Sequence, residues 1–408
     1  MKRLLACVAV AWVLTGCGGP HGDGQPIKSN PEQIARGKYL AVAGDCAACH
    51  TAPGGAPMAG GAPLESPFGV LFGTNITPHP EHGIGRWNAD DFYAAMHDGS
   101  APGGRQLYPA MPYTSYRAMP REDVDAVYAY LMQLPAVAQP NREAHLKFPY
   151  NVRFGVWFWK LLFLKDELPA ATPGQSADWQ RGRYMADALG HCGECHTPRG
   201  WLGQMKGGET WKGAPIAHWL APDITPQGLA SRGWTEPDLA SFMKTGIAPQ
   251  GSAFAEMHLV VWLSTQHLNE ADMRAMLRYI AGDAGLPPAQ AVAVDNAAVQ
   301  RLAAGRQTYL NVCAGCHGRD GEGKPHVAVA MAGNSTLRQA DPRNLVVSVL
   351  AGLPAQEFPG LERMQDMPDF SGTLSDVEIA ELGNYLRAQF GSQSLDLQAN
   401  NIARLRHE

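Results

Sequence analysis

The chain has 408 residues, a formal net charge of −5 and only 17% charged residues. This length allows two to four domains, and the mild acidic balance argues against nucleic-acid binding, which needs a basic patch or stripe. The chain contains 45 glycines and 31 prolines, so we expect short elements joined by much loop.

The N-terminus has the layout of an export signal. A positive segment at residues 1–3 precedes an apolar run at residues 4–14 that is too short to span a bilayer, and Thr15-Gly16-Cys17 follows directly. Residues 14–17 are similar to the lipobox of bacterial lipoproteins, which predicts lipidation of Cys17 and attachment to the periplasmic side of the cell membrane. Ordinary cleavage without a lipid is the alternative. Residues 18–30 are expected to form a flexible tether.

Three Cys-x-x-Cys-His motifs follow, at residues 46–50, 192–196 and 313–317. Two thiols three positions apart can each add to a vinyl group of one porphyrin, and the adjoining histidine then reaches the iron. A redox-active Cys-x-x-Cys pair is the alternative, but it gives no reason for a histidine in all three. The sequence predicts three covalent haem c groups, held by Cys46, Cys49, Cys192, Cys195, Cys313 and Cys316, with His50, His196 and His317 as proximal iron ligands.

The segments that precede the motifs also repeat. Residues 36–41 (RGKYLA) match residues 181–186 (RGRYMA), and residues 304–310 carry a variant. Asn30 and Pro31 suit the N-cap and first position of a helix that runs into the first motif. The glycine of this segment would let another helix approach closely.

Matching features follow the motifs as well. Residues 75–78 (NITP) are echoed at 223–226 (DITP), and short helices are expected to end near Gly99 and Gly246. An amphipathic helix with a tyrosine–aliphatic pair closes each unit, at Tyr130-Leu131, Tyr279-Ile280 and Tyr385-Leu386, and Ser375-x-x-Glu378 before the last is a capping box.

This order of helix, haem motif, loops and helix is the cytochrome c plan. We therefore expect an all-α, loop-rich fold of three tandem cytochrome c domains, each wrapped round one haem. Their expected bounds are 31–140, 176–283 and 297–391, with linkers at 141–175 and 284–296 and a polar tail at 392–408.

An aromatic cluster at residues 148–164 lies in the first linker and is too short to cross a bilayer. Three interpretations are open: packing between the first two domains, docking on a partner subunit, or insertion at the membrane interface.

Methionines are the candidates for the sixth iron position. Met111 and Met257 both lie 61 residues after the motif histidine of their unit, and a shared offset in matched repeats favours a shared role. Met243 and His258 compete in the second unit. In the third unit Met367, just before the closing helix, is preferred to Met364.

Together with Asn75-Ile76-Thr77-Pro78 and Leu107-Tyr108-Pro109-Ala110-Met111-Pro112, these motifs make residues 31–391 resemble the tri-haem cytochrome c subunits of bacterial membrane-bound dehydrogenases. The resemblance implies an electron-transfer subunit without a substrate site of its own. Its implied partners are a quinoprotein, flavoprotein or molybdenum hydroxylase as electron donor, and ubiquinone or a terminal oxidase as acceptor. The chain departs from the family pattern at residues 358–363, which are interposed before the third-unit methionine.

Two other functions remain open from the sequence. A free-standing multihaem enzyme, such as a peroxidase or a thiosulfate-oxidising cytochrome, would need one haem with an open distal side. A soluble periplasmic shuttle would lack the lipid. The sequence shows no acid–base pair, nucleophile constellation or dinucleotide fingerprint, and scattered histidines are expected to be structural or solvated: His79, His82, His97, His218 and His326.

Overall fold

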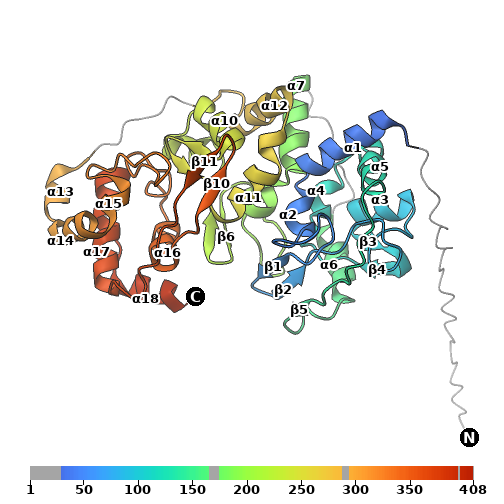
Figure 1. Ribbon diagram of the computed structural model, residues 1–408, viewed down its shortest axis with the longest axis horizontal. Coiled ribbons are helices and arrows are strands. Elements are labelled where there is room, and N and C mark those ends of the chain that lie inside the picture. Colours follow the sequence, from blue (N-terminus) through green and yellow to red (C-terminus); the bar gives the residue numbers. More distant parts are fainter. Residues whose placement is uncertain (1–28, 165–173, 287–293, 394–395, 408) are drawn as a thin grey trace, which may run out of the picture.

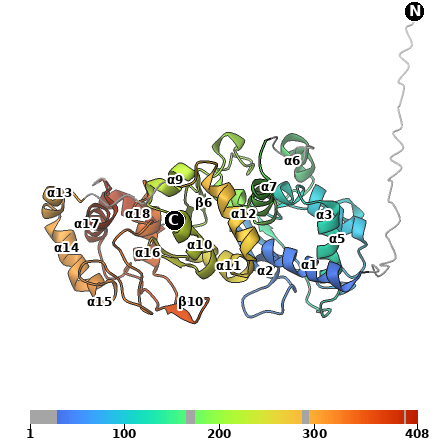
Figure 2. The same cartoon turned by 90° about the horizontal axis from the view of Figure 1, so that it is seen from above.

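The computed structural model describes residues 29–164, 174–286, 294–393 and 396–407. The molecule is elongated, and successive parts of the chain follow one another along its long axis, from α1 and α5 at one end to α13, α14 and α17 at the other (Figure 1; Figure 2).

Helices dominate, and the strands are short. The α-helices are α1 (Pro31–Ala43), α2 (Cys46–His50), α3 (Ala89–Asp98), α4 (Tyr113–Tyr116), α5 (Arg121–Leu131), α6 (Gly155–Phe163), α7 (Ala177–Arg183), α8 (Cys192–His196), α9 (Pro226–Ser231), α10 (Glu236–Thr245), α11 (Ala255–Leu263), α12 (Glu270–Ala281), α13 (Asn296–Gln300), α14 (Ala303–Thr308), α15 (Ala314–His317), α16 (Arg343–Ala351), α17 (Asp376–Leu386) and α18 (Ala399–His407). The strands are β1 (Pro63–Ser66), β2 (Gly69–Phe72), β3 (Ser100–Ala101), β4 (Arg105–Gln106), β5 (His145–Leu146), β6 (Ala214–Ile216), β7 (Trp219–Ala221), β8 (Ile247–Ala248), β9 (Gly251–Ser252), β10 (Gln356–Phe358) and β11 (Glu362–Met364). They pair as one antiparallel sheet in the order β1-β2-β5 and as separate two-stranded hairpins.

A pair of crossing helices recurs along the chain: α1 with α5, α7 with α12, and α14 with α17. We call the parts built on these pairs the first, second and third repeats. In each pair a glycine of the first helix lies so close to a backbone carbonyl of the second that a Cβ would collide with it. The glycines and their carbonyl partners are Gly37 with Ala126, Gly182 with Ala275 and Gly305 with Glu381. The close helix approach expected from the sequence is thus confirmed, and the same contact defines all three repeats.

The expected helix ends are also confirmed. The Asn30 side chain accepts a hydrogen bond from the Gln33 N–H at 2.7 Å at the start of α1, and Ser375 forms a capping box with Glu378 at the start of α17. Gly99 and Gly246 end α3 and α10 in the left-handed conformation.

The structure adds two features to the sequence expectations. The first helices of the second and third repeats continue as π-helical segments, η2 (Tyr184–Leu189) and η5 (Tyr309–Cys313), and π-helical turns are often found next to functional sites. The expected polar tail contains α18, whose Ile402 is fully buried against the third repeat while Arg406 pairs with Asp376 at 2.7 Å. One apolar stripe on this mostly polar helix is enough to pack it against the core of the third repeat.

The hydrophobic core is continuous across the first two repeats and separate in the third. One cluster of buried side chains runs from Leu40 to Ile280, and a second runs from Tyr309 to Ile402. A small third cluster brings Phe358 of the third repeat together with Ala253 and Val261 of the second. The third repeat therefore has its own core, and the small third cluster joins it to the second repeat.

Helix α6 lies within the expected first linker and has one anchored side. Val156 is buried, the Trp159 indole donates to the Leu202 carbonyl at 2.9 Å, and Lys160 Nζ donates to the Asp98 carbonyl at 2.6 Å. This side of α6 therefore packs between the first two repeats, which is one of the three interpretations drawn from the sequence. The other side is exposed and carries Phe154, Trp157, Phe158, Leu161 and Leu162. Among the residues that the structure describes, no helix combines the length and apolar character needed to cross a membrane.

Candidate haem sites

The first two Cys-x-x-Cys-His motifs each form a short helix of their own, α2 and α8, while the third is divided between Cys313 at the end of η5 and α15. In the first two repeats the residue before the first cysteine has a positive φ, 52° for Asp45 and 37° for His191, and this separates the motif helix from the helix that precedes it. In the third repeat η5 leads directly into α15. Since a left-handed residue turns the chain sharply, the first two motifs share a geometry that the third lacks.

The motif histidines make the same hydrogen bond in all three repeats. Each ring contacts a backbone carbonyl through Nδ1: His50 with Thr74 at 2.6 Å, His196 with Pro222 at 2.7 Å and His317 with Val329 at 3.0 Å. A carbonyl can only accept, so Nδ1 carries the proton and Nε2 keeps a free lone pair, as an iron-ligating imidazole requires.

Burial lowers the pKa of all three imidazoles, that of His196 to about 4. The hydrogen bonds from Nδ1 act in the opposite direction but do not offset burial. These rings are therefore neutral near pH 7, the state that can bind a metal.

A glycine clamp, missed by the sequence reasoning, holds each histidine from the other side. The N–H of a glycine with positive φ donates to the histidine carbonyl, and the same glycine lies against the peptide group that accepts from the ring. The donors are Gly60 to His50 at 2.8 Å, Gly213 to His196 at 2.8 Å and Gly323 to His317 at 2.7 Å. The distance in sequence from histidine to glycine differs in each repeat, so no fixed spacing reveals the clamp.

The motif cysteines are half-buried, except for Cys316, which is exposed. Burial raises the pKa of the Cys46, Cys192 and Cys195 thiols to about 12 and that of Cys49 and Cys313 to about 11. Thiol–disulfide enzymes need a lowered thiol pKa. The structure thus favours covalent attachment over the redox-pair alternative.

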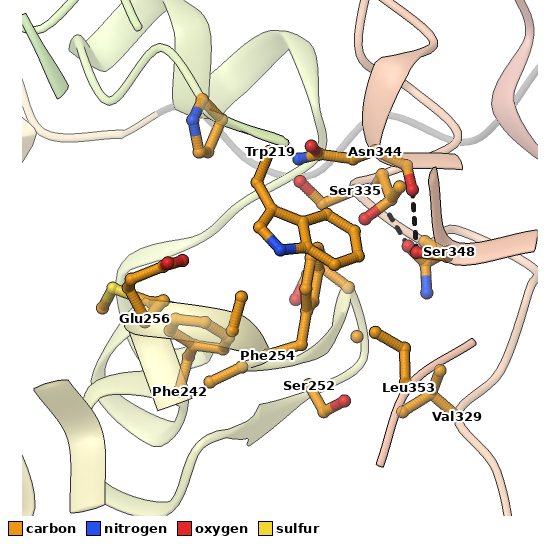
Figure 3. A pocket seen from close by; sticks show the side chains of 18 of the residues that line it. Trp219, Phe242, Ser252, Phe254, Glu256, Val329, Ser335, Asn344, Ser348 and Leu353 are labelled. Atoms are coloured by element: carbon orange, nitrogen blue, oxygen red, sulfur yellow. Dashed lines mark hydrogen bonds between the residues drawn. The ribbon is translucent and has the colours of Figure 1, made fainter. Parts of the chain in front are cut away.

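The second and third sites open into one cavity of about 400 Å³. Its lining brings together the predicted residues Cys192, Cys195, His196 and Met257 with Cys313, Cys316, His317 and Met367. Trp219 projects between the two sides, with Phe254 and Glu256 of the second repeat on one side and Ser335, Asn344 and Ser348 of the third on the other (Figure 3). The Trp219 and Phe254 rings pack edge to face with centroids 5.2 Å apart.

The methionines differ in how the structure places them. Met257 lines the cavity from α11, as does its competitor Met243 from α10, whereas the Nε2 atom of His258 bonds the Glu357 carbonyl at 2.8 Å. Since Nε2 is occupied, His258 is the poorest of the three candidates.

In the third repeat both candidates line the cavity. Met367 packs with that repeat's own core and pairs with Leu353 through the backbone, while Met364 packs with the small cluster around Phe358. This placement supports Met367. Met111 of the first repeat packs against the same core as Cys46, and both are partly buried. All three ligand assignments remain predictions.

A buried arginine completes the cavity. Arg232 lines it, is only 4% exposed, and donates through Nε to the Ser335 hydroxyl at 3.1 Å. Burial lowers its pKa to about 10. The nearby Asp223 carboxylate offsets burial only in part. A buried cation is stabilised by anionic partners, and the carboxylates of a haem would supply further ones. Thiol pairs, free imidazole lone pairs, thioethers, apolar walls and this cation together fit haem c.

Scattered histidines take local contacts instead. His79 Nδ1 accepts from the Glu81 and His82 backbone N–H groups, His97 bonds Asp98, and His326 bonds Glu362.

This fold and these sites define a c-type cytochrome. Comparison with known proteins agrees: residues 34–135 match the family model described as cytochrome c, and residues 300–386 match the one described as cytochrome c oxidase, cbb3-type, subunit III.

The chain is 35% identical over 430 residues to the cytochrome c subunit of alcohol dehydrogenase (quinone) of Gluconobacter oxydans. This alignment covers 99% of this chain and 89% of that protein. It is 35% identical over 402 residues to the gluconate 2-dehydrogenase cytochrome c subunit of Pantoea cypripedii, covering 93% and 91%. It is 40% identical over 369 residues to a nicotinate dehydrogenase subunit of Pseudomonas putida, covering 88% of this chain but only 30% of that protein. The chain belongs to the family of cytochrome c subunits of bacterial membrane-bound dehydrogenases, and it is an electron-transfer subunit.

Proposed function

We propose that the chain carries three covalent haem c groups, one in each of the domains 31–140, 176–283 and 297–391, and passes electrons along them. The threefold histidine clamp is the observation that carries this proposal, because its ring bond and its glycine bond recur in every repeat. The cysteine pairs would hold the haems covalently. The axial pairs would be His50 with Met111, His196 with Met257, and His317 with Met367. When bound, haem supplies one-electron chemistry at its iron.

The side chains of this protein set what each iron can do. The Nδ1 hydrogen bonds fix the tautomer and orientation of each imidazole, and a thioether on the opposite side would leave no position for oxygen, peroxide or water. A thioether ligand also raises the reduction potential. This arrangement favours electron transfer over a free-standing peroxidase or thiosulfate-oxidising enzyme.

The partners follow from the named relatives. Cytochrome c subunits of alcohol and gluconate dehydrogenases are among them, so a catalytic dehydrogenase would deliver electrons to this chain. A quinoprotein, flavoprotein or molybdenum hydroxylase could fill this role, and ubiquinone or a terminal oxidase would be the acceptor. Substrate chemistry would belong to the partner.

We place the protein on the periplasmic side of the cell membrane, anchored by a lipid on Cys17. The lipobox-like segment at residues 14–17 supports the anchor. The exposed side of α6, with two phenylalanines, a tryptophan and two leucines, suits the depth of lipid headgroups.

Spectra of the purified haem-loaded protein test the electron-transfer role. We expect three low-spin haems that do not bind carbon monoxide stoichiometrically when reduced. A full equivalent of high-spin haem that binds carbon monoxide would instead indicate an open catalytic site.

A further inference from the structure

The segment at residues 358–363, which departs from the family pattern, belongs to a hairpin that reaches across to the second repeat. Strands β10 and β11 pair antiparallel, with Gln356 opposite Met364 and Phe358 opposite Glu362. Figure 1 shows the hairpin extending from the third repeat toward α10 and α11. Its turn is free, since Leu361 is 97% exposed.

The base of the hairpin is buried in the second repeat. Phe358 is 2% exposed and lies in one apolar cluster with Ala253 and Val261, against which Met257 also packs. Its ring covers Gly246, where a Cβ would collide with it. The hairpin thus packs directly against α11, the helix that carries the predicted sixth ligand.

The hairpin also holds the residue beside that ligand. His258 Nε2 is 2.8 Å from the Glu357 carbonyl, which can only accept, so Nε2 carries a proton. The imidazole packs edge to face on Phe358 with centroids 5.2 Å apart and stacks with Trp262 on its own helix. Adjacent helix positions point about 100° apart, so only a rotation of α11 would bring His258 to the cavity, and the same rotation would turn Met257 away from it.

We propose that the β10–β11 hairpin selects the sixth ligand of the second haem: it fixes His258 on the outside of α11 and so keeps Met257 facing the iron. Phe358 is the positioning residue of this device, because its ring is wedged between Gly246 and α11. The inference rests on the proposed His/Met ligation of the second site. It means that the third repeat sets the potential of a haem in the second, because methionine and histidine ligands give different potentials.

The test uses the full-length, haem-loaded protein and three variants of Phe358. Three haems per chain are first verified by pyridine haemochrome. The readouts are the methionine-to-ferric-iron charge-transfer absorption band, low-temperature EPR and the three midpoint potentials. For Phe358→Ala we expect about one third of the charge-transfer band to be lost, with one potential lowered and a bis-histidine EPR signal appearing. Phe358→Leu keeps a large apolar side chain and should show the wild-type spectrum. Leu361→Ala, at the exposed turn of the same hairpin, should also show the wild-type spectrum.

The double variant Phe358→Ala/His258→Ala identifies the incoming ligand. We expect it to lack the bis-histidine signal while the charge-transfer band stays reduced. If Phe358→Ala fails to mature with three haems, Phe358→Val provides a milder truncation with the same expected direction. A full charge-transfer band and unchanged potentials in a truncation that holds three haems would overturn the proposal. Met257→Ala separates the two claims: if it leaves the wild-type band intact, the proposed ligation is wrong.

Discussion

The two junctions between repeats are built differently. Between the first and second repeats the contact is reciprocal: Tyr39 donates to Asp272 at 2.6 Å, and its counterpart Tyr184 donates to Asp123. Each aspartate is also paired with an arginine of its own repeat. Matched residues that exchange matched contacts form a pseudo-two-fold interface, like that of a symmetric dimer, and a continuous core lies beneath it.

The junction between the second and third repeats has no such symmetry. Asn344 accepts from the Leu220 N–H and donates to the Leu220 carbonyl, both at 2.8 Å, and Ser335 N–H donates to the Gln250 carbonyl at 2.8 Å. The hairpin and the shared cavity complete the contact. The first junction thus joins two similar units through their helices, while the second joins a different unit through the region of the sites themselves.

Removal of one haem should produce the largest change in reduction potential, and it tests most clearly whether the two junctions differ. In Cys192→Ala/Cys195→Ala we expect two haems per chain and a changed potential for the third haem, because the second and third sites share a cavity. Cys46→Ala/Cys49→Ala, the matched pair in the first repeat, should lose one haem with little effect on the third. Haem counting and a redox titration give both results. Equal effects of the two pairs on the third haem would show that the cavity does not couple the sites.

Loss of a sixth ligand should have the next largest effect. Met257→Ala and Met111→Ala should each lower one midpoint potential, within the roughly 0.8 V range that axial ligands span, and should let one haem bind carbon monoxide. Spectroelectrochemistry with and without carbon monoxide measures this. Met243→Ala, a neighbour in the same cavity, serves as the control, and carbon monoxide binding by that variant alone would transfer the assignment to Met243.

Asn344 tests the second junction without touching a haem ligand. It is 3% exposed, and Asn344→Ala would leave both polar groups of Leu220 without their partner. Such a loss costs about 1–3 kcal/mol for each unsatisfied group. Urea unfolding should therefore show earlier release of the third repeat while the first two unfold as before. A uniform shift of the whole transition would contradict the separate-core description.

The tyrosine pair tests the symmetry of the first junction. Tyr39→Phe and Tyr184→Phe should each lower the free energy of unfolding by about 1.5–3 kcal/mol, since each removes a hydrogen bond to a carboxylate while keeping the ring. Tyr39→Phe also removes the hydrogen bond that the Tyr39 hydroxyl accepts from the Asn269 side chain at 2.9 Å. The pseudo-two-fold arrangement predicts similar costs for the two carboxylate bonds, with a small excess for Tyr39→Phe from its contact with Asn269. A much larger cost for one of them would show that the contacts are equivalent in geometry only.

Asp45 should give the smallest effect, seen only as a pH dependence. Burial raises the pKa of its carboxyl to about 8, and it borders both the first motif and the shared cavity. The group is neutral below that pH and negative above it, and a nearby negative charge favours ferric over ferrous iron. One midpoint potential should therefore fall as the pH rises through about 8. Asp45→Asn should remove this slope, and an unchanged slope would assign it to another group.

Local signals in the sequence predicted the haem motifs, the N-cap at Asn30, the helix ends at Gly99 and Gly246 and the close helix crossings. These features depend on residues near one another or on matched positions in a repeat. The glycine clamp could not be read in this way, because its spacing from the histidine changes with loop length. The hairpin appeared only as a departure from a pattern, since the burial of Phe358 depends on a helix about 100 residues earlier in the chain.

The number of covalent haems per chain tests the central claim most directly. Denaturing mass spectrometry of the mature protein, combined with pyridine haemochrome absorbance per mole of chain, gives this number without assumptions about ligands. We predict the mass of three haems, with each of the three Cys-x-x-Cys-His peptides carrying one. Two or fewer haems in fully matured protein, or a motif peptide with free thiols, would contradict the account.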